Sequence, residues 1–201
     1  MKNFVLFLLV SGCLVFGGGW QSRGRAKKGD PPQSSGKLPR VKAPEPVDIY
    51  KGLRERVLTS KPEELGVEGA GAGSQAYGVL MEMGLSSGLA SVVSFSTGDA
   101  SLYTGTGGGI LGGGGYPAVN RASRSLVAEA NRHLGRTALT KEFPYADIDR
   151  IRFYVLTRDG VYTAEAVADE LARGRHALSP LFRAGNEVIT QLRLNTEKKE
   201  Q

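Results

Sequence analysis

The start of the chain limits how much of it can belong to a folded domain. Residues 4–10 form an unbroken apolar run directly after Met1-Lys2-Asn3, and weaker apolar character continues to a glycine cluster at residues 17–19. A short positive start, a short apolar run and then small residues are typical of a secretory signal. We therefore expect residues 1–19 to be a signal peptide or membrane anchor, which leaves the fold to the residues that follow.

The only cysteine of the chain, Cys13, lies inside this segment. The stretch Leu9-Val10-Ser11-Gly12-Cys13 resembles a bacterial lipobox, in which the cysteine is lipidated and becomes the new N-terminus. The alternatives are simple cleavage near residues 17–19 and an uncleaved anchor, although a span needs about 20 apolar residues. Cys13 is thus the lipidation candidate, and a single cysteine excludes an internal disulfide framework.

The next segment carries the net charge of the whole protein. Between residues 21 and 42, seven basic residues accompany one acid, Asp30, so this stretch contributes +6, which equals the formal net charge of the chain. The rest of the protein is therefore close to neutral. Because Gly, Pro and Ser are plentiful here and apolar residues are scarce, we expect residues 20–46 to be a disordered basic linker.

Anionic lipid and nucleic acid are two kinds of partner that attract a basic linker. Its basic residues, between positions 23 and 42, adjoin an apolar segment and suit anionic lipid headgroups, at about 1 kcal/mol per basic residue near the surface. Under the positive-inside bias they favour an N-out, C-in anchor with a cytoplasmic domain, as the alternative to export or lipid anchoring. Nucleic acid is an unlikely partner, because the basic stretch has no interleaved aromatic residues.

Residues 47–197 are long enough for one domain with its own core, and a polar tail follows at residues 198–201. Apolar residues at helical spacing predict four helices, over 48–58, 117–134, 168–173 and from Ser179 onward. Alternating apolar residues predict five strands, over 76–83, 89–96, 100–104, 151–157 and 161–167. An Asp-Gly pair between the last two strands is a strong hairpin signal.

The order of these elements predicts the architecture. Both clear strand pairings are hairpins, and hairpins join antiparallel strands. We therefore expect an α+β fold in which a mainly antiparallel sheet of about five strands is covered by helices, in the order α-βββ-α-ββ-α-α. In the first strand, Tyr77, Val79, Met81 and Met83 should share one face, with Glu82 on the other.

Residues 105–115 are unusual because eight of the eleven are glycine. Glycine amides next to a helix start can bind an anion, so the candidate anion-binding residues here are Gly112, Gly113, Gly114, Gly115, Arg121 and Arg124. The competing interpretation is structural: the glycines allow positive φ angles or close backbone packing. A dinucleotide site or P-loop is not indicated, because the acid about 20 residues on and the Lys-Ser or Lys-Thr pair are missing.

Other residues suited to catalysis are sparse. His133 ends a predicted helix, where a cation suits the helix dipole. His176 precedes Ser179, and the sequence predicts an N-cap role for that serine. Isolated histidines do not make a zinc-ligand set, so we expect no metal and no cofactor.

These patterns favour a non-enzymatic α+β domain, membrane-tethered or exported, that binds a protein partner or forms a homo-oligomer. The alternative is a small domain that binds an anionic ligand, or acts as an enzyme, through residues 105–115 with Arg121 and Arg124. The first hypothesis rests on the delivery and linker signals, and the second on the glycine-rich segment.

Overall fold

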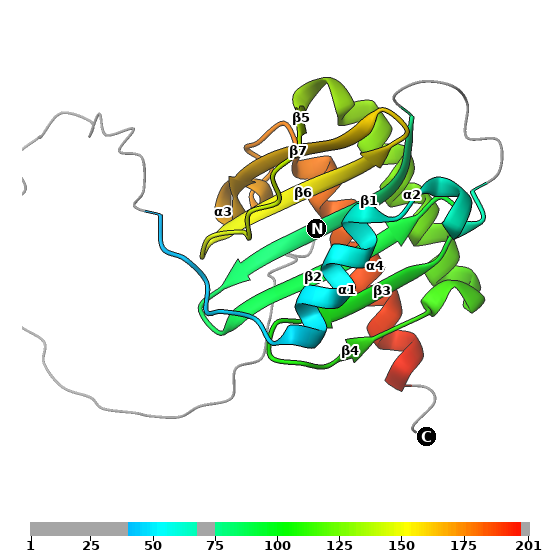
Figure 1. Ribbon diagram of the computed structural model, residues 1–201, viewed down its shortest axis with the longest axis horizontal. Helices are drawn as coiled ribbons and strands as arrows, with labels where there is room; N and C mark the ends of the chain where they lie inside the picture. The colour runs from blue at the N-terminus through cyan, green and yellow to red at the C-terminus, as the bar shows by residue number, and fades with distance from the viewer. Residues whose placement is uncertain (1–39, 68–74, 198–201) are drawn as a thin grey trace, which may run out of the picture. The chain divides into compact units, whose positions relative to one another are not determined.

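One antiparallel sheet of seven strands organises the residues that this computed structural model describes, 40–67 and 75–197 (Figure 1). The strand order is β4-β3-β2-β1-β6-β7-β5. The strands are β1 (Ala76–Leu85), β2 (Gly88–Phe95), β3 (Ala100–Thr104), β4 (Gly109–Ile110), β5 (Ala138–Thr140), β6 (Arg150–Thr157) and β7 (Gly160–Val167). The helices are α1 (Asp48–Thr59), α2 (Pro117–His133), α3 (Ala168–Ala172) and α4 (Ser179–Glu197).

The α+β class, the antiparallel pairing and the five predicted strands are confirmed. The sheet nevertheless has two strands more than expected, β4 and β5, which span two and three residues and lie at opposite edges. Segments this short show no alternation of apolar and polar residues, so nothing in the sequence distinguishes them from loops. The expected count of about five strands is wrong for this reason.

Helices α2 and α4 cover one face of the sheet. Val79, Met81 and Met83 of β1 belong to the core on this side. An added Cβ at Gly185 in α4 would lie 2.5 Å from the Met81 sulfur, so the missing side chain lets the helix approach the sheet closely. Four apolar residues of α4 are buried in this core and Ile189 is partly buried; the four are Leu181, Phe182, Val188 and Leu192.

Helix α1 lies over the opposite face, where Tyr50 and Leu58 pack into a second core (Figure 1). Tyr77 belongs to this second core, so the prediction that it shares a face with Val79 is wrong. The cause is a shift in register between Ala76 and Gly78, where β1 pairs with β6. A bulge of this kind interrupts the alternation of side chains along a strand.

The end of the predicted linker lies against the domain. Val41 accepts a backbone hydrogen bond from Ile148 at 2.7 Å, and Lys42 forms an isolated β-bridge with Asp147. The compact unit begins at Arg40, so residues 40–46 belong to the domain and not to the linker. The predictions for residues 1–19 with Cys13, for residues 20–39 and for the polar tail fall outside the described residues.

Candidate functional site

The glycine-rich segment, residues 105–115, leads from β3 through β4 into α2. An added Cβ at Gly113 would lie 2.4 Å from Leu192 Cδ2, and one at Gly114 would lie 1.9 Å from Asp99 Oδ1. A side chain at either position would force Leu192 or Asp99 to move, which supports the structural interpretation of these glycines. The Asp99 carboxylate also places a negative charge beside the loop, which opposes the approach of an anion.

The two arginines of the anion hypothesis contact different parts of the domain. Arg124 donates through Nη2 to the Thr97 carbonyl at 2.8 Å and through Nε to Asn120 Oδ1 at 2.9 Å. Arg121 lines a hollow between α2 and α4, together with Glu187. Hydrogen bonds thus hold Arg124 at the β2–β3 turn, whereas Arg121 is exposed beside the hollow between the helices.

Both histidines make structural contacts. The ring nitrogens of His133 lie 3.1 Å from the Glu129 carbonyl oxygen and 3.0 Å from that of Ala177, which links α2 to the segment before α4. The His176 ring accepts a backbone N–H through Nδ1 at 3.1 Å. The Ser179 hydroxyl accepts the His176 backbone N–H at 3.3 Å, and α4 begins at Ser179 itself, not after it as an N-cap would require.

The open edge of the sheet at β4 is one candidate interaction surface. Ile110 pairs with Leu102 of β3, and Thr104 N donates to the Gly108 carbonyl at 3.0 Å. In an antiparallel ladder, alternate residues direct their backbone groups toward the partner strand. Gly109, between the two inward-facing residues, therefore directs its N–H and C=O to the open edge.

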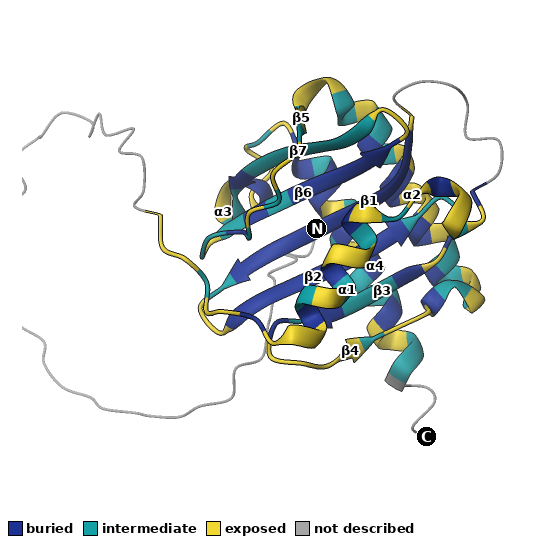
Figure 2. Cartoon of the chain, in the orientation of Figure 1, coloured by how far each residue is buried: buried dark blue, intermediate teal, exposed yellow. Residues whose placement is uncertain are grey.

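Exposed apolar side chains flank this strand. Leu111 is 62% exposed, and Val47 and Ile49 at the start of α1 are 41% and 67% exposed. Figure 2 shows exposed positions at the start of α1 and along the segment that holds β4. Val47 N donates to the Gly105 carbonyl at 2.8 Å, which holds the start of α1 beside the β3–β4 turn. Residues 100–120 contain no charged side chain. We call residues 105–111 with Val47 and Ile49 the β4 edge.

The opposite edge of the sheet is different in character. Its strand β5 has one exposed large apolar residue, Leu139, which is 58% exposed. Arg136 precedes this strand, and Lys141 and Glu142 follow it. Charged residues at a strand edge discourage pairing with another chain. The two edges thus differ in charge while presenting similarly exposed leucines.

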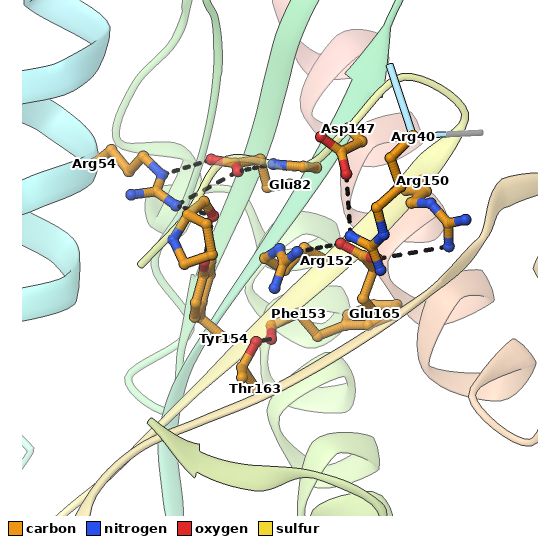
Figure 3. A network of polar contacts seen from close by, with 12 residues as sticks. Arg40, Arg54, Glu82, Asp147, Arg150, Arg152, Phe153, Tyr154, Thr163 and Glu165 are labelled. Carbon is orange, nitrogen blue, oxygen red and sulfur yellow. Dashed lines mark hydrogen bonds and ion pairs between the residues drawn. The ribbon is translucent and has the colours of Figure 1, made fainter. Parts of the chain in front are cut away.

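A buried ion pair between α1 and the sheet is the second candidate site (Figure 3). Glu82 of β1 is fully buried, and Arg54 of α1 is 6% exposed. Arg54 Nε donates to Glu82 Oε2 at 2.6 Å, and the Tyr50 hydroxyl donates to the same oxygen at 2.9 Å. The Ala146 N–H donates to Oε1 at 2.8 Å. The carboxylate is therefore held by donors from α1 and from the segment before β6.

The guanidinium group of Arg54 is enclosed on several sides. Its Nη2 donates to the Pro144 carbonyl at 3.1 Å, and its central carbon lies 4.7 Å from the Tyr145 ring and 5.2 Å from the Tyr154 ring. Burial acts against the charge of Arg54, but Glu82 outweighs it and raises the pKa. Burial also raises the pKa of Tyr154 to about 12. The arginine is thus kept charged in an aromatic surrounding.

A second charge cluster lies beside this pair on the same face of the sheet. Glu165 of β7 pairs with Arg152 of β6, and its Oε1 lies 3.5 Å from Arg150 Nη1 and 2.7 Å from Arg40 Nη2. Arg40 also contacts Asp147 at 3.0 Å. The strand register places Arg152 between Glu165 and the buried pair, so charges of opposite sign alternate across the sheet. Such cross-strand pairs stabilise a sheet.

Glu82 lies on the face of β1 that the sequence predicted, opposite Val79, but its partner Arg54 was not predicted. The missed signal is in the first helix, where Tyr50, Arg54 and Leu58 recur at a spacing of four and form its buried stripe. A buried charge requires a partner of opposite charge. This applies both to an arginine within the buried stripe of a helix and to a lone carboxylate within an apolar strand. The sequence therefore allowed Arg54 to be predicted as the partner of Glu82.

Comparison with protein-family models, with curated proteins and with solved structures finds no match for this chain. Among residues 40–67 and 75–197, no helix is long and apolar enough to cross a membrane. The same residues hold no group of three or more His, Cys, Asp or Glu side chains that could bind a metal ion.

Proposed function

We propose that the domain is a protein-interaction module that assembles with a second copy of itself through the β4 edge. The observation that carries this proposal is an uncharged open strand flanked by exposed apolar side chains. Unpaired backbone groups at a sheet edge are a template for pairing with another chain. Side chains beside the strand then add apolar contact area on either side of the new pair.

A second copy suits this edge better than a charged partner. A two-fold axis brings the same patch of both subunits together, so the patch must be complementary to itself. Residues 100–120 bring no charge to such a contact. The charges beside Val47 and Ile49 are paired within the chain, since Lys51 Nζ lies 2.9 Å from Glu45 Oε1 and 3.6 Å from Asp48 Oδ1. Burying one leucine or isoleucine completely stabilises a contact by about 1.5–3 kcal/mol. Leu111 and Ile49, each more than 60% exposed, are the main apolar contributors.

Delivery to a membrane is part of the proposal. It rests on the apolar run in residues 1–19 and on the basic residues at 23–42, which suit anionic lipid headgroups. Copies held on one surface meet at a raised effective concentration, which would make even a modest edge contact sufficient. A reporter fused after Gln201 would identify the compartment that the domain occupies.

The test compares two leucine variants at opposite edges of the sheet. We expect the full chain, in mild detergent, to sediment as a dimer that dissociates on dilution. Leu111→Lys should shift this equilibrium toward monomer, because it adds a charge to both sides of the contact. Leu139→Lys is the matched control, since Leu139 is 58% exposed against 62% for Leu111 and lies at the other edge.

Two results would contradict the proposal. If the wild-type chain remains monomeric at every accessible concentration, it does not self-associate. A dimer that Leu111→Lys and Leu139→Lys weaken equally would show that association does not use the β4 edge. The melting temperature of each variant serves as the check that both still fold.

A further inference from the structure

We propose that the space beneath α1 that the Arg54 side chain occupies is a binding site for a guanidinium group, which this chain fills with its own arginine. We call this site the guanidinium pocket and define it by Glu82 and the residues that surround the Arg54 side chain: Pro144, Tyr145, Ala146 and Tyr154. The pocket lies on the inner side of α1. The inference is therefore independent of the β4 edge and of self-association.

The walls of the pocket are positioned without Arg54. The Glu82 carboxylate accepts the Ala146 N–H at 2.8 Å, which orients it from the side away from α1. The Pro144 carbonyl accepts the Tyr154 hydroxyl at 2.5 Å. Both acceptors of the guanidinium group thus have their own support from β1, β6 and the segment before β6 (Figure 3). Only the Tyr50 hydroxyl, which also contacts Glu82, comes from α1.

The chemistry of the pocket suits a planar fork of N–H donors. Arg54 Nε lies 2.6 Å from one carboxylate oxygen, while Nη2 reaches the Pro144 carbonyl at 3.1 Å. Two tyrosine rings lie within cation–π range of the guanidinium carbon, at 4.7 and 5.2 Å. A compact ammonium cannot reach acceptors on two sides and cover the rings at the same time. The site therefore selects guanidinium over ammonium.

Removing the Arg54 side chain should leave this pocket empty but formed. In the Arg54→Ala chain, the buried Glu82 carboxylate loses its counter-ion, and the space of the guanidinium group becomes available. A cavity cut into a well-packed protein can bind a molecule of matching shape and chemistry. Methylguanidinium is the smallest probe that carries the missing group.

The experiment is chemical rescue of the full-length Arg54→Ala chain. We expect methylguanidinium chloride to raise its melting temperature with a saturable dependence on concentration, as binding to the folded state alone requires. Methylammonium chloride at the same ionic strength should not do so. The wild-type chain should show no shift beyond that of sodium chloride, because Arg54 already occupies the site.

Two further variants make the outcome decisive. Glu82→Gln combined with Arg54→Ala removes the charge that holds the cation and should abolish the rescue. Arg54→Lys should melt below wild type, because an ammonium replaces the fork. If Arg54→Ala does not fold alone, its refolding yield is compared in the two salts. Equal effects of methylguanidinium and methylammonium, in melting or in refolding, would overturn the inference.

Discussion

The buried pair of Arg54 and Glu82 offers the sharpest energetic test of the fold. Replacing one partner of a buried ion pair leaves the other charge uncompensated and costs about 3–5 kcal/mol. Arg54→Met leaves Glu82 with two remaining donors, the Tyr50 hydroxyl and the Ala146 N–H. We therefore expect a loss near the lower end, about 3 kcal/mol. The same loss is expected for Glu82→Gln, since Arg54 keeps only neutral acceptors.

The double variant separates the charge effect from packing. If each single loss comes mainly from an unpaired charge, removing both charges together should cost little more than removing one. The expected coupling energy is about 2–3 kcal/mol, the upper part of the range for residues in direct contact. Against a domain stability of about 5–15 kcal/mol, each single loss is large enough to measure precisely.

The assay is equilibrium unfolding in urea, followed by circular dichroism. A shift of the midpoint with an unchanged slope reports a true loss of stability. The reasoning is refuted if both single variants lose less than about 1 kcal/mol, the range of exposed ion pairs. It is also refuted if the double variant loses the sum of the two, because the charges would then act independently.

Three further predictions concern hydroxyl groups, alkaline pH and salt. Tyr50→Phe should cost about 1.5–3 kcal/mol, because it removes a hydrogen bond to the buried Glu82, whereas Tyr103→Phe should be neutral or stabilising. The Tyr103 hydroxyl is buried and has no hydrogen-bond partner within the described residues. If urea unfolding shows the same loss of stability for Tyr103→Phe as for Tyr50→Phe, the prediction is wrong. Burial raises the pKa of Tyr154 from 10.0 to about 12, so the stability contributed by its neutral form is complete below pH 10 and is lost as the pH rises through about 12. Melting temperatures across the alkaline range should therefore fall less steeply in Tyr154→Phe, and identical slopes would count against a shifted pKa. Arg40→Gln should cost at most about 1 kcal/mol, because that side chain is 50% exposed, and the loss should shrink in high salt. A loss that is independent of salt would point to packing and not to charge.

The elements that sequence reasoning found are those whose signals lie among neighbouring residues. Apolar spacing indicated all four helices and the five longer strands, because burial of one face imposes a period on the residues that form it. Gly185 of α4 is different, because its close approach to Met81 is a contact between distant residues. The bulge at the start of β1 leaves no such signal, and Tyr77 was therefore assigned to the wrong face.

The candidate sites depended on pairings between distant residues. Nothing local indicates that β1 lies against β6, which brings Glu82 next to Arg152, or that α1 places Arg54 on the same carboxylate. Nor does the glycine-rich segment reveal that it contains an edge strand, since two residues cannot show a period. Long-range packing of the two halves of the sheet decides which strand lies at the edge and which charged residues form pairs. Local periodicity carries no information about that choice.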